Sequence, residues 1–289
     1  MPGYEPRFYR DWSKDKDLIS FTVVVKESDL YVRATRNLSR KALKVLLRHR
    51  ASLEEYIRRK PAFLTSLEPL AVGQDAPLIV KAMAEAAQKV GVGPMAAVAG
   101  AIAEYVGCEL LPFSREVIVE NGGDIFLKTQ KTRSIGIYAG ESSPFTGKLA
   151  LIIEPKETPL GICTSAGTVG HSLSFGKCDA AILLSPSASL ADAAATAVGN
   201  LIQSADDIQK GIDFAKGVEG IKGVVIIKDD RIGVWGDIEL VPCNTIFDGR
   251  AVASPARKRD WQGSKSEIPR EGKYGNGVFL DSHLHGNDK

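Results

Sequence analysis

The residues with the clearest chemical potential lie at the start of an alanine-rich segment. Asp192 and Thr196 stand one helical turn apart in LADAAATAVGN, and Ser187 or Ser189 can cap a helix that runs through it. A carboxylate and a hydroxyl at this spacing project from one face of a helix. Hard cations such as magnesium prefer oxygen ligands of this kind. The spacing predicts a metal site at Asp192 and Thr196, completed by carbonyl and phosphate oxygens.

Two polar stretches upstream have the composition of ligand-binding turns. They are Asn121-Gly122-Gly123-Asp124, and Thr164 and Ser165 followed by Ala166 and Gly167. Adjacent glycines can take positive φ and let a ligand approach the main chain closely. Successive N–H groups in such turns can cradle a phosphate. We predict that both stretches contact a phosphate-bearing cofactor; the alternative for the glycine pair is a plain turn.

Three further side chains could take part in chemistry. His171 lies among the polar turns and could act as a general acid or base near neutral pH, or serve only as a hydrogen-bonded structural residue. Cys163 and Cys178 flank the turns and could carry a thiolate or persulfide. That role requires a lowered thiol pKa; the alternative is that both are small buried apolar residues.

A sheet and helices packed on it must position these residues. Short, mostly β-branched apolar runs predict buried strands at Glu116–Glu120, Ser134–Tyr138 and Leu149–Ile153. ISFTVVVK and DLYVRAT predict a hairpin near the start, and the run Ile221–Pro242 predicts another hairpin, turning at Lys228–Arg231, and a final strand. Several hairpins in a mixed element order favour an α+β fold with largely antiparallel sheets.

The remaining segments predict helices and a tail. Helices are expected at Arg40–Lys60, Ala76–Val90, Met95–Gly107 and Ala205–Lys216. Residues 1–246 are predicted to form one domain. Residues 247–289 are rich in Gly, Pro, Ser and charge, so they cannot bury enough apolar surface to offset their ordering entropy. We predict a flexible basic tail there.

Composition argues against several classes of protein. A net charge of +2 gives no reason to expect a nucleic-acid partner. No apolar run approaches the roughly 20 residues that cross a bilayer, so no membrane association is expected. The first residues lack an apolar signal core, which predicts a cytoplasmic protein. The four cysteines include no CxxC pair, which argues against a disulfide framework or zinc site. A homodimer is the default expectation for a soluble enzyme.

Three motifs in order resemble signatures of the ApbE superfamily. They are NGGDI at residues 121–125, TSAG at 164–167 and ADAAATA at 191–197. The chain more closely resembles an ApbE-related branch through VGPM at 92–95, VENGGD at 119–124 and GHSLSFG at 170–176. The resemblance covers about Tyr9 to Val241 and implies an ApbE-like, T-fold-like architecture.

Members of that superfamily include magnesium-dependent flavin transferases that split FAD and attach FMN to a threonine of an acceptor protein. The resemblance implies that Gly122 and Gly123 pack against FAD, FMN or a related nucleotide, and that Asn121, Asp124 and Gly167 belong to the same binding turns. It implies further that Thr164 and Ser165 line the pyrophosphate. Asp192 and Thr196 would bind Mg²⁺.

The chain also departs from the transferase pattern. The interval after the TSAG turn is short, and His171 has no following Asp-Pro, where the transferases carry an HxxDP segment. Ala99-Gly100 stands where they carry Lys-Gly, and Glu104 stands near their aspartate. Three functions therefore stay open: a FAD:protein FMN transferase-like enzyme, a non-catalytic flavin- or nucleotide-binding module, and a sulfur-transfer protein of homocysteine- or thiamine-related metabolism using Cys163 or Cys178.

Overall fold

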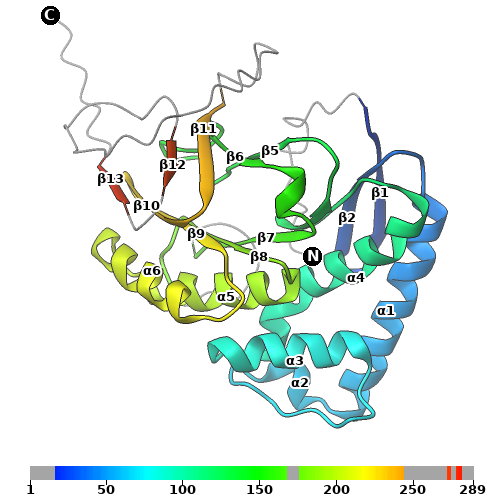
Figure 1. Ribbon diagram of the computed structural model, residues 1–289. Helices are drawn as coiled ribbons and strands as arrows, with labels where there is room; N and C mark the ends of the chain where they lie inside the picture. The colour runs from blue at the N-terminus through cyan, green and yellow to red at the C-terminus, as the bar shows by residue number, and fades with distance from the viewer. Residues whose placement is uncertain (1–16, 168–175, 244–271, 275–277, 282–289) are drawn as a thin grey trace, which may run out of the picture.

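The protein has three layers: helices, a large sheet and a smaller sheet (Figure 1). The structure is a computed structural model that describes residues 17–167, 176–243, 272–274 and 278–281. All strand pairs in these ranges are antiparallel. The predicted α+β class with largely antiparallel sheets is therefore confirmed.

The large sheet has nine strands in the order β1-β2-β3-β4-β7-β8-β9-β10-β13. Their bounds are β1 Ile19–Val25, β2 Ser28–Ala34, β3 Val117–Asn121, β4 Asp124–Lys128, β7 Leu160–Ser165, β8 Ala180–Ser185, β9 Gly223–Lys228, β10 Arg231–Gly236 and β13 Val278–Asp281. The small sheet has the order β12-β11-β6-β5. Its strands are β5 Arg133–Gly136, β6 Leu149–Ile153, β11 Ile238–Pro242 and β12 Gly272–Tyr274.

The helices lie together against one face of the large sheet (Figure 1). They are α1 Ser39–Arg59, α2 Ala62–Thr65, α3 Leu78–Val90, α4 Val98–Leu110, α5 Ala188–Leu201 and α6 Ile208–Gly217, with 3₁₀ turns at Pro94–Ala97, Leu111–Phe113, Pro155–Glu157 and Ala205–Asp207. Helix α1 has an amphipathic pattern whose apolar stripe, including Leu46 and Leu53, is buried. Helix α3 ends at Gly91, whose left-handed φ of 73° suits a helix C-terminus.

Alternation along the central strands divides the interior into two cores. Val119, Phe126 and Leu183 point to the helical layer, whereas Ile118 and Leu127 point to the small sheet. Successive strand residues face opposite sides of a sheet, so one strand supplies both cores. Both faces of the large sheet are therefore covered, and its middle strands are almost fully buried.

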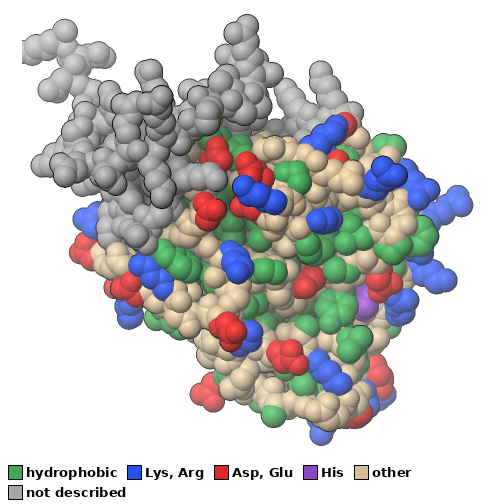
Figure 2. All heavy atoms as spheres, viewed as in Figure 1, with side chains coloured by type: hydrophobic (Ala, Val, Ile, Leu, Met, Phe, Trp, Pro, Cys, Tyr) green, Lys and Arg blue, Asp and Glu red, His purple; other side chains and the backbone are tan. Residues whose placement is uncertain are grey.

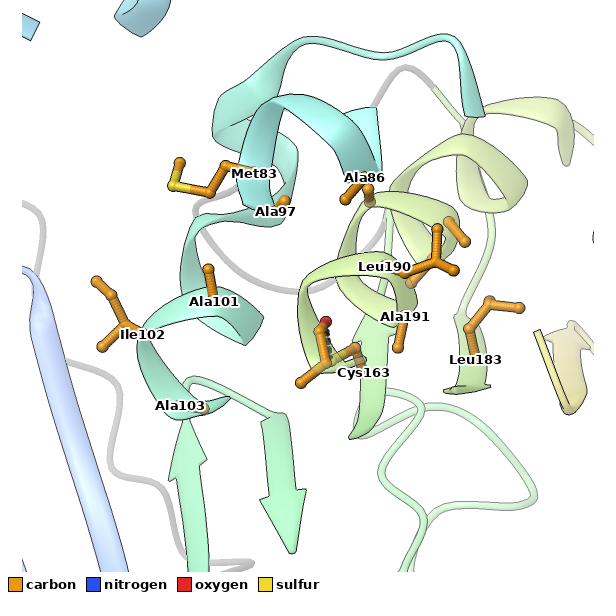
Figure 3. Close-up of a cluster of buried hydrophobic side chains, with 14 of the residues drawn as sticks. Met83, Ala86, Ala97, Ala101, Ile102, Ala103, Cys163, Leu183, Leu190 and Ala191 are labelled. Atoms are coloured by element: carbon orange, nitrogen blue, oxygen red, sulfur yellow. Dashed lines mark hydrogen bonds between the residues drawn. The ribbon is translucent and has the colours of Figure 1, made fainter. Parts of the chain in front are cut away.

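Helix α5 is the most buried helix and the centre of the helical layer. It contacts β7, β8, α3, α4 and α6. Figure 3 shows its residues Leu190 and Ala191 packed between α4 and the sheet. A Cβ at Gly161 of β7 would lie only 2.3 Å from the Cα of Ala188, so the backbones of β7 and α5 approach closely. The alanines of α5 thus permit tight packing of helix on sheet.

The run Pro94–Phe113, which includes α4, is long and apolar enough to cross a membrane by length and composition alone. The expectation that no apolar run reaches this length is therefore wrong. In the structure α4 packs against β3, β4 and α5, and Ile102, Val106 and Leu110 are buried. Such a run occurs in the sequence because this helix serves the protein core.

Most of the predicted tail, residues 247–289, lies outside the described residues. The exceptions are β12 and β13, which pair with β11 and β10. Acidic and basic side chains are interspersed on the described surface in the view of Figure 2.

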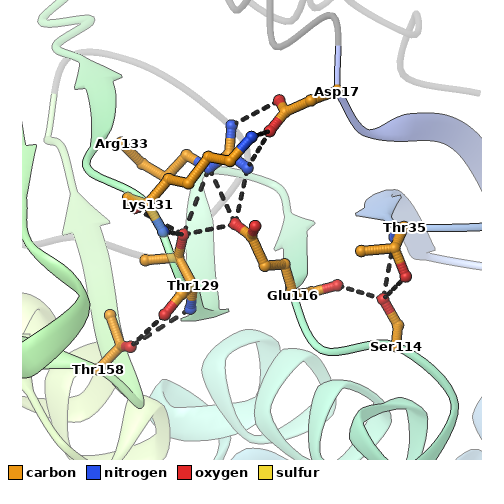
Figure 4. A network of polar contacts seen from close by, with 8 residues as sticks. All are labelled: Asp17, Thr35, Ser114, Glu116, Thr129, Lys131, Arg133 and Thr158. Atoms are coloured by element: carbon orange, nitrogen blue, oxygen red, sulfur yellow. Dashed lines mark hydrogen bonds and ion pairs between the residues drawn. The ribbon is translucent and has the colours of Figure 1, made fainter.

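A largely buried ion-pair network joins Asp17 to Arg133 of β5 and to Glu116, the residue before β3 (Figure 4). Arg133, with a side chain only 4% exposed, is bonded to Glu116 at 2.6 Å and to Asp17 at 2.9 Å. Thr129 donates to Glu116 at 2.6 Å. The bonds from Arg133 and Lys131 hold the pKa of Asp17 well below its usual range.

Replacing Arg133 by methionine should lower the free energy of unfolding by about 3–5 kcal/mol, because Glu116 would be left buried without a cation. Adding Glu116→Gln should recover much of the loss, since the uncompensated charge is removed. Urea unfolding at pH 7 measures both effects. A loss below about 1 kcal/mol, the range of exposed pairs, would show that the network is solvated.

Candidate functional site

The first part of the candidate site is the turn between β3 and β4. Gly122 and Gly123 have φ values of 71° and 105°, the left-handed region in which glycine is favoured. Nothing lies within 4 Å of a Cβ built at Gly123, so its conformation, and not crowding, favours glycine. The N–H of Gly123 donates to Glu120 Oε1 at 3.1 Å. That group is therefore occupied within the turn, whereas Gly122 is exposed.

Asp124 joins this turn to the TSAG stretch. It is the first residue of β4, its side chain is buried, and its Oδ1 accepts a hydrogen bond from the Thr164 N–H at 3.0 Å. Strand β4 pairs with β7 in the sheet, which brings these two stretches together across 40 residues of sequence. The predicted turns at 121–124 and 164–167 thus lie side by side.

Asp192 joins the same region from α5. Ser187 caps this helix by accepting from the Leu190 N–H, as one of the two predicted caps. Asp192 Oδ2 accepts from the Gly100 N–H of α4 at 2.8 Å. Asn121 Nδ2 donates to the carbonyl of Ala99, the residue before Gly100 in α4, at 3.1 Å. The glycine turn and the start of α5 therefore meet at one backbone segment of α4.

The two aspartates are close enough to affect each other electrostatically. Burial raises the pKa of Asp124 well above its usual value, and the charge of Asp192 raises it further, against the hydrogen bond from Thr164. Burial raises the pKa of Asp192 to about 7, although the N–H groups of Gly100 and Ala99 oppose this. Two adjacent buried carboxylates are stable when protons or a cation reduce their charge.

The raised pKa of Asp192 predicts that the stability of the folded protein depends on pH. The folded-state pKa of Asp192 is raised from 3.8 to about 7, so the folded protein binds more protons than the unfolded chain between these values. The free energy of unfolding of the metal-free protein should therefore fall as pH rises from about 4 to 7, by on the order of 1–4 kcal/mol from this residue. Denaturant unfolding across this range measures it, with Asp192→Asn as the comparison. Equal slopes in both proteins would contradict the assignment.

The other predicted site residues differ in how far they are buried and in what they contact. Thr196 is half-buried, one turn beyond Asp192 on α5. Ser165 is buried beside α5, and its Oγ lies 3.3 Å from a Cβ built at Gly199. Gly167 is exposed and donates its N–H to the Cys178 carbonyl at 2.8 Å. His171 lies outside the described residues.

The donors at this site suit a hard cation. Asp124 and Asp192 supply carboxylates, and Thr196 supplies a hydroxyl on the same helix as Asp192. Magnesium is typically bound by one or two carboxylates together with water and substrate phosphate oxygens. The described part of the chain has no group of three or more His, Cys, Asp or Glu suited to a metal. Two carboxylates and one hydroxyl would leave coordination positions for water and a phosphate ligand to fill.

The two candidate cysteines are buried thiols. Cys163 donates its S–H to the Ala188 carbonyl at 3.3 Å, and Cys178 to the Ile227 carbonyl at 3.4 Å. Burial raises the pKa of Cys163 well above its usual value, with a further rise from Asp124 and Asp192. Burial also raises the pKa of Cys178 to about 12. Burial and the raised pKa values disfavour a thiolate at both positions, so these contacts give no support to sulfur transfer.

Gly100 also belongs to this region, although the sequence alone assigns it no role. A Cβ at Gly100 would lie 2.3 Å from the Ala188 carbonyl oxygen and 2.8 Å from Asp192 Cβ. The glycine thus permits the close contact of α4 with α5 through which Asp192 is bonded. The run of small residues in AAVAGAIA was the signal in the sequence, but it did not reveal which backbone would approach.

The layered fold and the meeting of the GGD turn, the TSAG stretch and the ADAAATA helix define an ApbE-like α+β protein. The family model described as AbpE bacteria matches residues 10–230, and the chain belongs to this family. A UPF0280 protein of Methanocaldococcus jannaschii is 40% identical over 226 residues, covering 76% of this chain and 91% of the relative. A UPF0280 protein of Methanococcus aeolicus is 44% identical over 184 residues, covering 63% and 71%.

Two solved structures are similar to this chain at a much lower sequence identity. The apo flavinyl transferase ApbE of Pseudomonas stutzeri is 14% identical, with a TM-score of 0.47, and the match covers 73% of this chain and 91% of that one. The flavin transferase ApbE of Vibrio cholerae is 14% identical, with a TM-score of 0.44, covering 73% and 93%.

Proposed function

We propose that this protein binds FAD, FMN or a related nucleotide through a magnesium–pyrophosphate site at the meeting point of α5 with the β3–β4 turn. The observation that carries the proposal is the pair of buried, adjacent carboxylates, Asp124 and Asp192, beside an exposed glycine turn. A divalent cation would offset their mutual repulsion, and a diphosphate would complete its oxygen shell. Membership of an ApbE-type family supports a flavin as the nucleotide.

Each protein group has a defined part in this proposal. Gly122, exposed and without a side chain, lets the ligand approach the main chain. Asp192 and Thr196, with Asp124 beside them, would hold Mg²⁺. The metal would neutralise phosphate charge and stabilise a phosphate leaving group. Asp124 also keeps the Thr164 backbone at the site by accepting its N–H.

The activity proposed for this site is Mg²⁺-dependent transfer of FMN from FAD to a hydroxyl of an acceptor protein. In that reaction the acceptor oxygen forms a bond to the FMN phosphorus, the pyrophosphate bond breaks, and AMP leaves with its phosphate. The acceptor proton passes to a base. The resemblance of the NGGDI, TSAG and ADAAATA motifs to those of flavin transferases supports this class of reaction.

The test is incubation of the purified protein with FAD, Mg²⁺ and a threonine-containing acceptor, followed by chromatography for AMP. Release of AMP that requires Mg²⁺ supports the enzyme. A thermal shift with FAD and Mg²⁺, but no AMP, would instead support the non-catalytic binding module. No shift with FAD, FMN or ATP and no AMP would contradict the proposed site.

A further inference from the structure

Helices α4 and α5 each present a carboxylate that accepts a hydrogen bond from the first turn of the other helix. Glu104 of α4 accepts from the N–H and the O–H of Ser189 at 3.0 and 3.1 Å, and from the O–H of Ser187 at 3.2 Å. Asp192 of α5 accepts from the N–H of Gly100 at 2.8 Å. Each helix therefore supplies an acceptor to the other.

The two contacts satisfy backbone groups that helices leave free. The first N–H groups of a helix have no partner within it, and an acidic group is favoured near that end by the helix dipole. Helix α4 begins at Val98 and its N-cap residue, Ala97, provides no side-chain cap. Asp192 fills this role for α4 through Gly100, and Glu104 does so for α5 through Ser189.

The two contacts are mechanically coupled because they lie about one helical turn apart on both helices. Gly100 and Glu104 are one turn apart on α4, and Ser189 and Asp192 are about one turn apart on α5. Between them the backbones nearly touch, because a Cβ at Gly100 would meet the Ala188 carbonyl oxygen. A shift of the start of α5 would therefore move Asp192 away from Gly100.

We infer that Glu104 is a positioning residue for the proposed metal site. It fixes the first turn of α5 against α4, and it thereby holds the Asp192 carboxylate at the Gly100 N–H and beside Asp124. This inference rests on the proposed function for its link to metal binding. Its structural part, the coupling between Glu104 and the Gly100–Asp192 bond, does not require a metal.

The experiment compares Glu104→Ala and Glu104→Gln with wild type and with Glu109→Ala. Glu109 lies on the same helix and bonds Arg48 and His49, away from α5, so it is the matched control. Two quantities are measured: hydrogen exchange of the Gly100 and Ser189 amides in the metal-free protein, and the Mg²⁺ dissociation constant by titration.

In Glu104→Ala we expect faster exchange at Gly100 as well as at Ser189, and about tenfold weaker Mg²⁺ binding, the lower end of losses for residues that orient metal ligands. Glu104→Gln should retain most of the amide protection and most of the Mg²⁺ affinity, because its amide oxygen can still accept from Ser189. Glu109→Ala should change neither. If the alanine variant does not fold, Glu104→Asp, whose shorter side chain cannot span both serines, provides the same comparison.

Faster exchange at Ser189 alone, with Gly100 protection and Mg²⁺ affinity unchanged, would show that Glu104 merely caps α5 and would overturn the inference. If wild type binds no Mg²⁺, the proposed function fails. The Gly100 exchange rate then decides the positioning role by itself.

Discussion

Replacing Asp192 by alanine is expected to slow Mg²⁺-dependent release of AMP from FAD sharply and to remove the stabilisation by Mg²⁺ and FAD together. The carboxylate is buried within hydrogen-bonding distance of α4 and acts electrostatically on Asp124. A metal ion contributes several kcal/mol to charge stabilisation at a reacting phosphate, so losing a ligand should lower the rate by roughly 100-fold or more. Chromatographic AMP assays and thermal shifts measure both effects.

The matched control is Asp213→Ala, which removes an exposed aspartate on α6 that is paired with Lys216. This change should leave both readouts at the wild-type level. Wild-type AMP release and an undiminished thermal shift in Asp192→Ala would contradict the assignment of Asp192 to the metal site.

The second large effect is expected from Gly100→Ala. The added Cβ would lie 2.3 Å from the carbonyl oxygen of Ala188 and 2.8 Å from Asp192 Cβ, distances at which something must move. Because the nearest atom is backbone, α4 and α5 must separate. We expect a loss of about 1–3 kcal/mol or more in the free energy of unfolding, together with weaker binding of Mg²⁺ and FAD.

The same substitution at Gly217, the last residue of α6, is the control. No atom lies within 4 Å of a Cβ built there, so alanine should be neutral or stabilising by up to about 1 kcal/mol, from its helix propensity. Urea unfolding compares the two variants. A Gly100→Ala protein as stable as wild type would show that the α4–α5 contact is looser than described.

Features encoded by local patterns were predictable from the sequence. The run Leu149–Ile153 is strand β6 with the expected bounds, and the predicted turn at Lys228–Arg231 joins β9 to β10. Ser187 caps α5 as one of the two serines proposed. Each of these depends on periodicity, turn chemistry or capping within a few residues, and tertiary contacts did not override them.

Contacts between distant segments were not predictable. The bond from Gly100 to Asp192 spans 92 residues, and the bond from Thr164 to Asp124 spans 40. Nothing in the local sequence distinguishes a glycine that meets a carboxylate from one that merely permits packing. Glu120 and Asp124 flank the glycine pair in sequence, but Glu120 accepts from Gly123, and the stronger electrostatic neighbour of Asp124 is Asp192, 68 residues away.

The first residue of a helix was also difficult to predict from the sequence, as α1 shows. Asn37 and Ser39 are residue types that commonly cap helices, but the N-cap residue of α1 is Leu38, with no side-chain cap. Asn37 Oδ1 accepts from the N–H of Ser39, two residues further along the chain. Two polar residues in succession offer alternative local hydrogen bonds, so the sequence alone leaves the register of the first turn open.

We expect one oxygen-coordinated cation and one diphosphate to share the space beside Asp192, Asp124 and the glycine turn. The most direct test is an anomalous-scattering map from crystals grown with Mn²⁺ and FAD. We expect a manganese peak within bonding distance of an Asp192 carboxylate oxygen, with the pyrophosphate next to Gly122. A manganese ion and a flavin bound elsewhere, with Asp192 bonded to Gly100 alone, would contradict it.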